Sequence, residues 1–142
     1  LGAETYPDVR RSQHRMDRAF TRVDETIAMA AVYAANHLER VAGMVCLTES
    51  GTTALRMSRL GSGLPIYALS RHPGVVRRMC LYRGVRPVLF DYTACAAGEV
   101  AQEAVNELQR RALVSAGERL ILTRGDLLGV GGSTTTLKII EL

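Results

Sequence analysis

Short apolar runs alternate with longer amphipathic stretches along most of this chain. Residues 44–47 are apolar without the polar alternation of a half-exposed strand, which predicts a strand that is covered on both faces. Similar runs predict further strands at 65–70, 86–90, 120–123 and 136–142. Apolar residues at helical spacing predict helices at 24–40, 54–60, 73–83 and 99–115. Thr21 or Asp24 is expected to cap the first helix and Gly117 to close the last one.

This alternation of strands and helices predicts an α/β fold. We expect a three-layer sandwich, in which a five-stranded, mostly parallel sheet has helices on both faces. Right-handed crossovers favour the strand order 3-2-1-4-5. Pro87 cannot donate a ladder hydrogen bond, so its strand is expected at an edge of the sheet. The last strand should be antiparallel to the fourth, because a loop and not a helix joins the two.

Two turns rich in hydroxyl groups and glycine are expected to meet at one crevice of this sheet. In such folds ligands bind at the carboxyl ends of strands where the strand order reverses, here between the first and fourth strands. The first of these strands leads into Ser50, Gly51, Thr52 and Thr53 at a helix N-terminus, where unpaired N–H groups favour an anion. The loop after the fourth strand, residues 124–135, can fold over a ligand. The pattern predicts a phosphate site, with simple capping of the helix by Ser50 or Thr52 as the alternative.

Two carboxylates, Glu49 and Asp126, can approach one another across this crevice. They suit hydrogen bonds to ligand hydroxyls as well as acid–base work. The glycine loop does not match the P-loop pattern, no Gly-x-Gly-x-x-Gly follows the first strand, and Thr48 stands where a nucleophile elbow needs glycine. The histidines at 14, 37 and 72 have no metal-ligand spacing. We therefore expect no catalytic residue and no metal site in this chain.

The composition suits one globular domain. The chain has 142 residues, of which 47% are hydrophobic, and a net charge of +4. The arginines are scattered, Lys138 is the only lysine, and aromatic residues make up 5%, which argues against nucleic-acid binding. No apolar run approaches the roughly 20 residues that span a bilayer, and no signal peptide begins the sequence, so no membrane partner is expected. Three well-separated cysteines are typical of a reduced, cytoplasmic protein.

Several motifs resemble the C-terminal domain of the pyruvate kinase family. They are MVCLTESGTTA at 44–54, GLPI at 63–66, SR at 70–71 and LYRGVRPV at 81–88. The runs AMA at 28–30 and YAANHL at 33–38 are similar to the bacterial type II form in particular. The resemblance covers nearly the whole chain, and LGAE at 1–4 resembles the end of the last helix of the catalytic barrel. The implied domains are 1–23, the barrel tail with a linker, and 24–142, the effector-binding domain.

The resemblance implies a regulatory domain that binds a phosphorylated activator and helps to join subunits into a tetramer. The implied effector site comprises Thr48, Glu49, Ser50, Gly51, Thr52, Thr53, Gly125, Asp126, Gly131, Gly132, Ser133 and Thr134. Relatives activated by fructose 1,6-bisphosphate hold its second phosphate with basic residues. Residues 98–100 stand at that place without a positive charge, so we expect a monophosphate such as AMP, ribose 5-phosphate or glucose 6-phosphate.

The resemblance also implies which chemistry lies elsewhere. The family transfers a phosphoryl group from phosphoenolpyruvate to ADP with Mg²⁺ and usually K⁺, and its lysine and metal-binding carboxylates belong to the barrel. We therefore expect no turnover and no cofactor in this domain alone. The implied partners are the phosphorylated effector, the barrel domain of the same chain and further copies of the protein. An alternative interpretation is a subunit-contact domain whose crevice is empty and whose alanine-rich first helix makes the contact.

Overall fold

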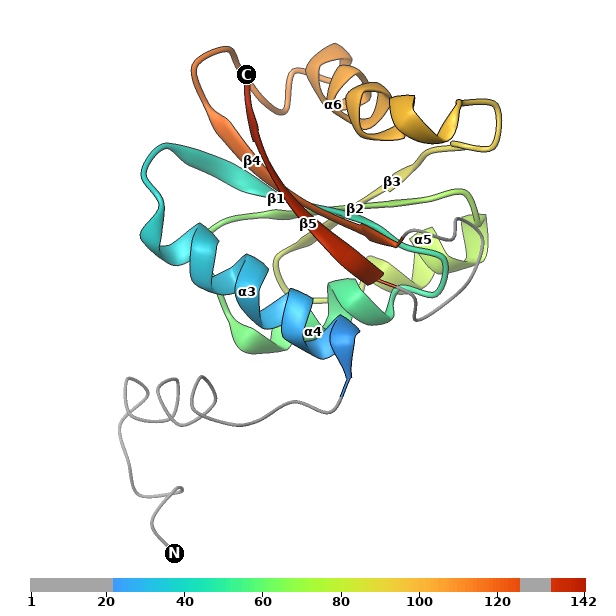
Figure 1. Ribbon diagram of the computed structural model, residues 1–142. Helices are drawn as coiled ribbons and strands as arrows, with labels where there is room; N and C mark the ends of the chain where they lie inside the picture. The colour runs from blue at the N-terminus through green and yellow to red at the C-terminus, as the bar shows by residue number, and fades with distance from the viewer. Residues whose placement is uncertain (1–21, 126–133) are drawn as a thin grey trace, which may run out of the picture.

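A computed structural model describes residues 22–125 and 134–142 of the chain (Figure 1). The elements are α3 (Val23–His37), β1 (Val41–Leu47), α4 (Thr52–Leu60), β2 (Ile66–Ser70), α5 (Pro73–Met79), β3 (Val85–Leu89), the 3₁₀ turn η1 (Ala97–Glu99), α6 (Val100–Arg110), β4 (Arg119–Gly125) and β5 (Thr134–Glu141). The expected barrel tail and linker at 1–23 lies almost entirely outside the described residues.

The five strands form one sheet in the order β3-β2-β1-β4-β5. Neighbouring strands are parallel except for β4 and β5, which are antiparallel. Pro87 pairs with Ala68 on the edge strand β3, where its missing N–H costs no ladder bond on the open side. The structure thus confirms the α/β class, the strand order and the direction of the last strand.

Helices cover both faces of the sheet (Figure 1). The helices α3, α4 and α5 lie on one face, and α6 lies on the other. Right-handed crossovers explain this division, because the chain steps outward from β1 to β3 and then returns past β1 to β4. Along β1, Val45 and Leu47 pack in the α6 layer, whereas Met44 and Cys46 pack in the opposite layer. Burial on both faces accounts for the unbroken apolar run of this strand.

Three of the five alanines of α3 pack inside the domain. Ala28, Ala31 and Ala35 are between 0% and 6% exposed and belong to the same core cluster as Met44. Small side chains at these positions let the helix approach the sheet closely. Ala30 is exposed and Ala34 is half-buried, so a subunit contact through this helix stays a prediction.

The first helix begins earlier than predicted. The residue before its first turn is Arg22, and Asp24 lies inside that turn, so the prediction that Asp24 caps the helix is wrong. Its carboxylate instead accepts a hydrogen bond from Arg22 (Nη2 to Oδ2, 2.8 Å) and faces Arg56 of α4 (3.5 Å). The other predicted cap, Thr21, lies outside the described residues.

The last helix ends earlier than predicted. It stops at Arg110, and Ala112 adopts a left-handed conformation with φ of 57°. The backbone N–H of Leu113 then donates to the carbonyl of Leu108 (3.0 Å), which is the bond that closes a helix ending in a left-handed residue. The prediction of a helix to residue 115 closed by Gly117 is therefore wrong, because alanine here takes the conformation usually given to glycine.

Candidate functional site

The turn between β1 and α4 places glycine directly before the helix. Gly51 has φ of +84°, a left-handed conformation that other residues rarely adopt. A Cβ atom at this position would lie 3.2 Å from Cγ of Met79 at the end of α5. Both the backbone conformation and the close approach of α5 therefore require glycine at the entry to α4.

Hydroxyl groups organise the same turn. Thr48 Oγ1 accepts a hydrogen bond from the Gly51 amide (2.8 Å), and Ser50 Oγ accepts one from the Thr52 amide (3.3 Å). Leu55 is the first residue of α4 whose amide reaches a backbone acceptor, the carbonyl of Gly51 (3.0 Å). The amides at 53 and 54 precede it and so have no intrahelical acceptor. The N-cap is Gly51, not Ser50 or Thr52, so the capping alternative is wrong about the residue at that position.

The described end of the second predicted turn meets the first one. Thr53 at the start of α4 and Thr134 at the start of β5 share a hydrogen bond of 2.8 Å between their hydroxyl oxygens, and both side chains are buried. Gly125 at the end of β4 is the ladder partner of Thr134. The strands β1 and β4 are parallel neighbours, so their carboxyl ends lie at one edge of the sheet. Four predicted site residues, Asp126, Gly131, Gly132 and Ser133, lie outside the described residues.

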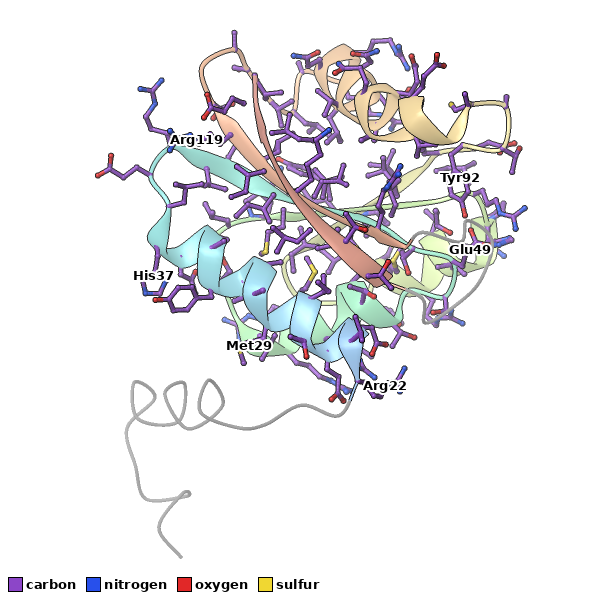
Figure 2. All side chains as sticks on the ribbon, in the orientation of Figure 1. Arg22, Met29, His37, Glu49, Tyr92 and Arg119 are labelled. Carbon is purple, nitrogen blue, oxygen red and sulfur yellow. The ribbon has the colours of Figure 1, made fainter. Side chains whose placement is uncertain are left out.

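Glu49 is turned toward β2 and β3. Its carboxylate accepts hydrogen bonds from Arg71 Nη2 (2.9 Å to Oε1), from Arg71 Nε and from the Tyr92 hydroxyl, and His72 Nε2 lies 2.9 Å from Oε1 (Figure 2). Arg71 also lies over the Tyr92 ring, 5.9 Å from its centroid. Burial pushes the pKa of the Glu49 carboxyl upward, but the hydrogen bonds from Arg71 and His72 outweigh burial and leave it below its usual value. The approach of Glu49 to Asp126 stays a prediction, because Asp126 lies outside the described residues.

Sequence reasoning missed the residues that surround this turn from the neighbouring loops. Arg71 and His72 follow β2, and Tyr92 follows β3, so all three stand at the same carboxyl edge as the predicted site. Arg78 of α5 donates from Nη2 to the Ser50 carbonyl (2.6 Å). The signal that would have found the first three is the rule already applied to β1, since parallel strands end at one edge.

Other chemistry finds little support in the described part of the chain. Burial raises the pKa of the Cys46 thiol to about 12, so this thiol stays protonated and is a poor nucleophile. Within 22–125 and 134–142, no group of three or more His, Cys, Asp or Glu residues is placed to hold a metal ion. Among the same residues no helix is both long and apolar enough to cross a bilayer.

Comparison with known proteins identifies the domain. The family described as "Pyruvate kinase, alpha/beta domain" matches residues 25–140. The chain is 49% identical to pyruvate kinase II of Salmonella typhimurium over 143 residues, which cover 100% of this chain and 29% of that protein. It is 42% identical to pyruvate kinase of Buchnera aphidicola subsp. Baizongia pistaciae, again over 100% of this chain and 29% of the relative.

A further relative extends this pattern. Pyruvate kinase of Haemophilus influenzae is 41% identical over 138 residues, which cover 96% of this chain and 28% of that protein. The chain thus spans less than a third of the length of these relatives. The family match and the identity over the whole chain agree with the strand order and the paired turns. This chain belongs to the pyruvate kinase family, as its alpha/beta domain.

Proposed function

We propose that this domain binds a phosphorylated effector and so regulates a pyruvate kinase. The phosphate group would bind at the turn 48–53, and the segment 125–134 would supply further contacts. The observation that carries this proposal is the 2.8 Å hydrogen bond between Thr53 and Thr134, which joins the two turns at the start of a helix. The amides at 53 and 54 and the positive end of the α4 dipole favour a negatively charged group there.

A monophosphate is the effector that these residues suit best. A second phosphate would need further positive charge, and residues 98–100, which stand near its place in bisphosphate-activated relatives, carry Glu99 and no basic residue. Arg71 is engaged by Glu49 through Nε and Nη2. AMP, ribose 5-phosphate and glucose 6-phosphate are the candidates that we propose.

The wider activity is proposed from family membership. The relatives are named pyruvate kinases, and we propose that this domain serves in such an enzyme, which forms pyruvate and ATP from phosphoenolpyruvate and ADP. Mg²⁺ and K⁺ would act in the catalytic barrel of the same protein, since the described residues of this domain hold no fitting cluster. Assembly into a tetramer and a cytoplasmic location belong to the same proposal, and the free cysteines suit a reducing compartment.

Thermal unfolding with added ligands tests effector binding directly. A ligand at 100 times its dissociation constant stabilises a folded protein by about 2.7 kcal/mol. We expect a monophosphate to raise the unfolding temperature of the 142-residue chain, with the parent sugar or nucleoside as the uncharged control. Tight binding of fructose 1,6-bisphosphate with no response to monophosphates would contradict the monophosphate preference. Pyruvate production by this chain alone would contradict the placement of the chemistry in another domain.

A domain used only for subunit contact is the second candidate. It would show no stabilisation by any phosphorylated ligand. Three alanines of α3 are buried in the core of the domain, and Ala30 on the same helix is exposed and available for such a contact. Sedimentation at several protein concentrations would reveal the association.

A further inference from the structure

Glu49 stands immediately before the candidate phosphate turn, yet within residues 22–125 and 134–142 the partners of its carboxylate come from the loops after β2 and β3. Arg71 Nε lies 3.1 Å from each carboxylate oxygen, and Arg71 Nη2 and His72 Nε2 each lie 2.9 Å from Oε1. The Tyr92 hydroxyl donates to Oε2. These partners follow β2 and β3, which lie on one side of β1, whereas β4 and β5 lie on the other.

These contacts occupy the acceptor capacity of the carboxylate. An ionised carboxylate has about four lone-pair sites, and here Arg71, His72 and Tyr92 use them. The side chain is only 11% exposed. Little capacity therefore remains for accepting a hydrogen bond from a hydroxyl group of a ligand at the turn.

The contacts of Glu49 also offset the repulsion that its charge would exert on a phosphate. An unpaired carboxylate beside a phosphate site would repel the phosphate, and the low pKa of Glu49 means that it carries its charge at neutral pH. Arg71 compensates that charge at 2.9 Å. The ion pair simultaneously fixes the backbone at Glu49, and the Thr48 amide donates to the Leu69 carbonyl (3.0 Å) one residue earlier. The turn is thus anchored to β2 through both backbone and side chain.

We propose that Glu49 is a positioning residue for the anion site and does not itself contact the effector. It fixes the turn 50–53 by joining the ends of β1, β2 and β3, and the hydroxyl and amide groups of that turn face the ligand. This inference rests on the proposed function, because it assigns a role within the same site. It differs from the sequence expectation that Glu49 binds hydroxyl groups of the ligand.

Calorimetric titration with two probes distinguishes positioning from contact. Inorganic phosphate lacks the carbon-borne hydroxyl groups that ribose 5-phosphate carries, so a direct contact with those groups would affect only the sugar phosphate. For Glu49→Gln we expect the affinity for both probes to fall by the same factor of about ten, the lower end of the effect known for residues that hold metal ligands in place. Loss of affinity for ribose 5-phosphate alone would overturn the proposal, and so would unchanged or increased affinity for both probes.

Glu107→Gln is the matched control. Glu107 also forms ion pairs, in its case with Arg110 (2.6 Å) and Arg111 (2.7 Å), and its pKa is likewise below the usual value. It belongs to α6, on the sheet face opposite α4. We expect this variant to bind both probes as the parent chain does. An equal loss of affinity in both variants would overturn the specific role of Glu49.

A milder variant and a ligand-free measurement complete the test. Tyr92→Phe keeps the buried ring and removes one donor to Glu49, so it should lower both affinities in the same direction but less. Amide hydrogen exchange at Gly51 reports the turn without any ligand, and it should be faster in Glu49→Gln than in Glu107→Gln. If the parent chain binds neither probe, the proposed function fails, whereas faster exchange at Gly51 would still support positioning. Unchanged exchange at Gly51 would overturn it.

Discussion

The carboxyl edge of the sheet differs on the two sides of β1. On the β2 and β3 side, Glu49, Arg71, His72 and Tyr92 form a charged cluster whose hydrogen bonds are made within the protein. On the β4 and β5 side, Thr53 and Thr134 share a hydrogen bond between two neutral hydroxyls. The comparison separates a charged anchor from the side of β1 on which we propose that a phosphate binds.

The difference follows from how each side satisfies its polar groups. A carboxylate that is only 11% exposed is costly unless it is paired, so the β2 and β3 side needs its arginine. Neutral hydroxyls can be buried with one partner each at a much smaller cost. A phosphate bound beside Thr53 and Thr134, as we propose, would therefore meet neutral hydroxyl groups.

The largest loss of stability is expected when a side chain is placed at Gly51, the residue that leads from β1 into α4. Gly51→Val would force a branched residue into a left-handed conformation against Met79, and we expect it to lower the free energy of unfolding by about 3 kcal/mol. Urea denaturation measures this loss. Gly63→Val is the control, because a Cβ atom there meets nothing within 4 Å, and it should have little effect. Similar losses in both variants would show that the turn is not uniquely constrained.

Breaking the hydroxyl side should have the next largest effect. Thr53→Val removes the bond to Thr134 and leaves a buried hydroxyl without its partner, at an expected cost of about 1–2 kcal/mol. Thr135→Val changes an exposed hydroxyl one residue along β5 and should be nearly neutral. Urea denaturation of the two variants compares them, and phosphate titration should show weaker binding for Thr53→Val only. Unaltered phosphate affinity in Thr53→Val would weaken the assignment of the site.

Protonation of Glu49 at acidic pH should remove the stabilising effect of its ion pair with Arg71. The pKa of Glu49 is lower in the folded chain than the unfolded value of about 4.3, so its ionised form stabilises the fold above that value. This contribution is lost as the pH falls through the folded pKa. The difference in unfolding free energy between the parent chain and Glu49→Gln should therefore be largest near neutral pH and shrink below about pH 4.3. A difference that does not change with pH would rule out the ion pair as its cause.

Measuring the unfolding free energy of Glu107→Gln over the same pH range shows whether the effect is particular to Glu49. The pKa of Glu107 is also lowered, by hydrogen bonds from Arg110 and Arg111, so the direction of the pH effect is the same. Its side chain is 20% exposed against 11% for Glu49, and solvent screens it more. We expect a smaller and more salt-sensitive change than for Glu49→Gln.

The smallest change in stability is expected for a substitution of Arg78 at the protein surface. Arg78 donates to the Ser50 carbonyl from an exposed position on α5. Arg78→Gln should change the free energy of unfolding by no more than about 0.5 kcal/mol, as surface substitutions usually do. Its phosphate affinity should fall slightly at low salt and match the parent at high salt, because exposed charges are screened. A large loss of affinity at high salt would mean that Arg78 binds the ligand directly.

Much of the fold could be predicted because its signals are local. The apolar run of β1, the proline of β3 and the loop between β4 and β5 each restrict the sheet, and together they allow the observed order. The meeting of the two turns followed from that order. The end of α6 could not be predicted, since Ala112 adopts a left-handed conformation that composition alone assigns to glycine.

The Glu49 cluster was missed for a different reason. Its partners are separated from it by 22 to 43 residues, and side-chain direction decides which of several neighbours they meet. Strand order placed Arg71 and Tyr92 at the correct edge but did not reveal that Glu49 turns toward them. Long-range side-chain pairs of this kind depend on packing geometry that no periodicity records.

The pairing of Gly125 with Thr134 has a consequence for how this domain can change over time. The two residues are ladder partners, so the eight-residue segment between them, 126–133, has both ends fixed by the sheet and by the bond from Thr134 to Thr53. Lengthening a connection whose ends are already held costs little, about 0.6 kcal/mol for each doubling. A change in the number of residues between Gly125 and Thr134 is therefore expected to leave the five-stranded sheet and the Thr53–Thr134 hydrogen bond in place.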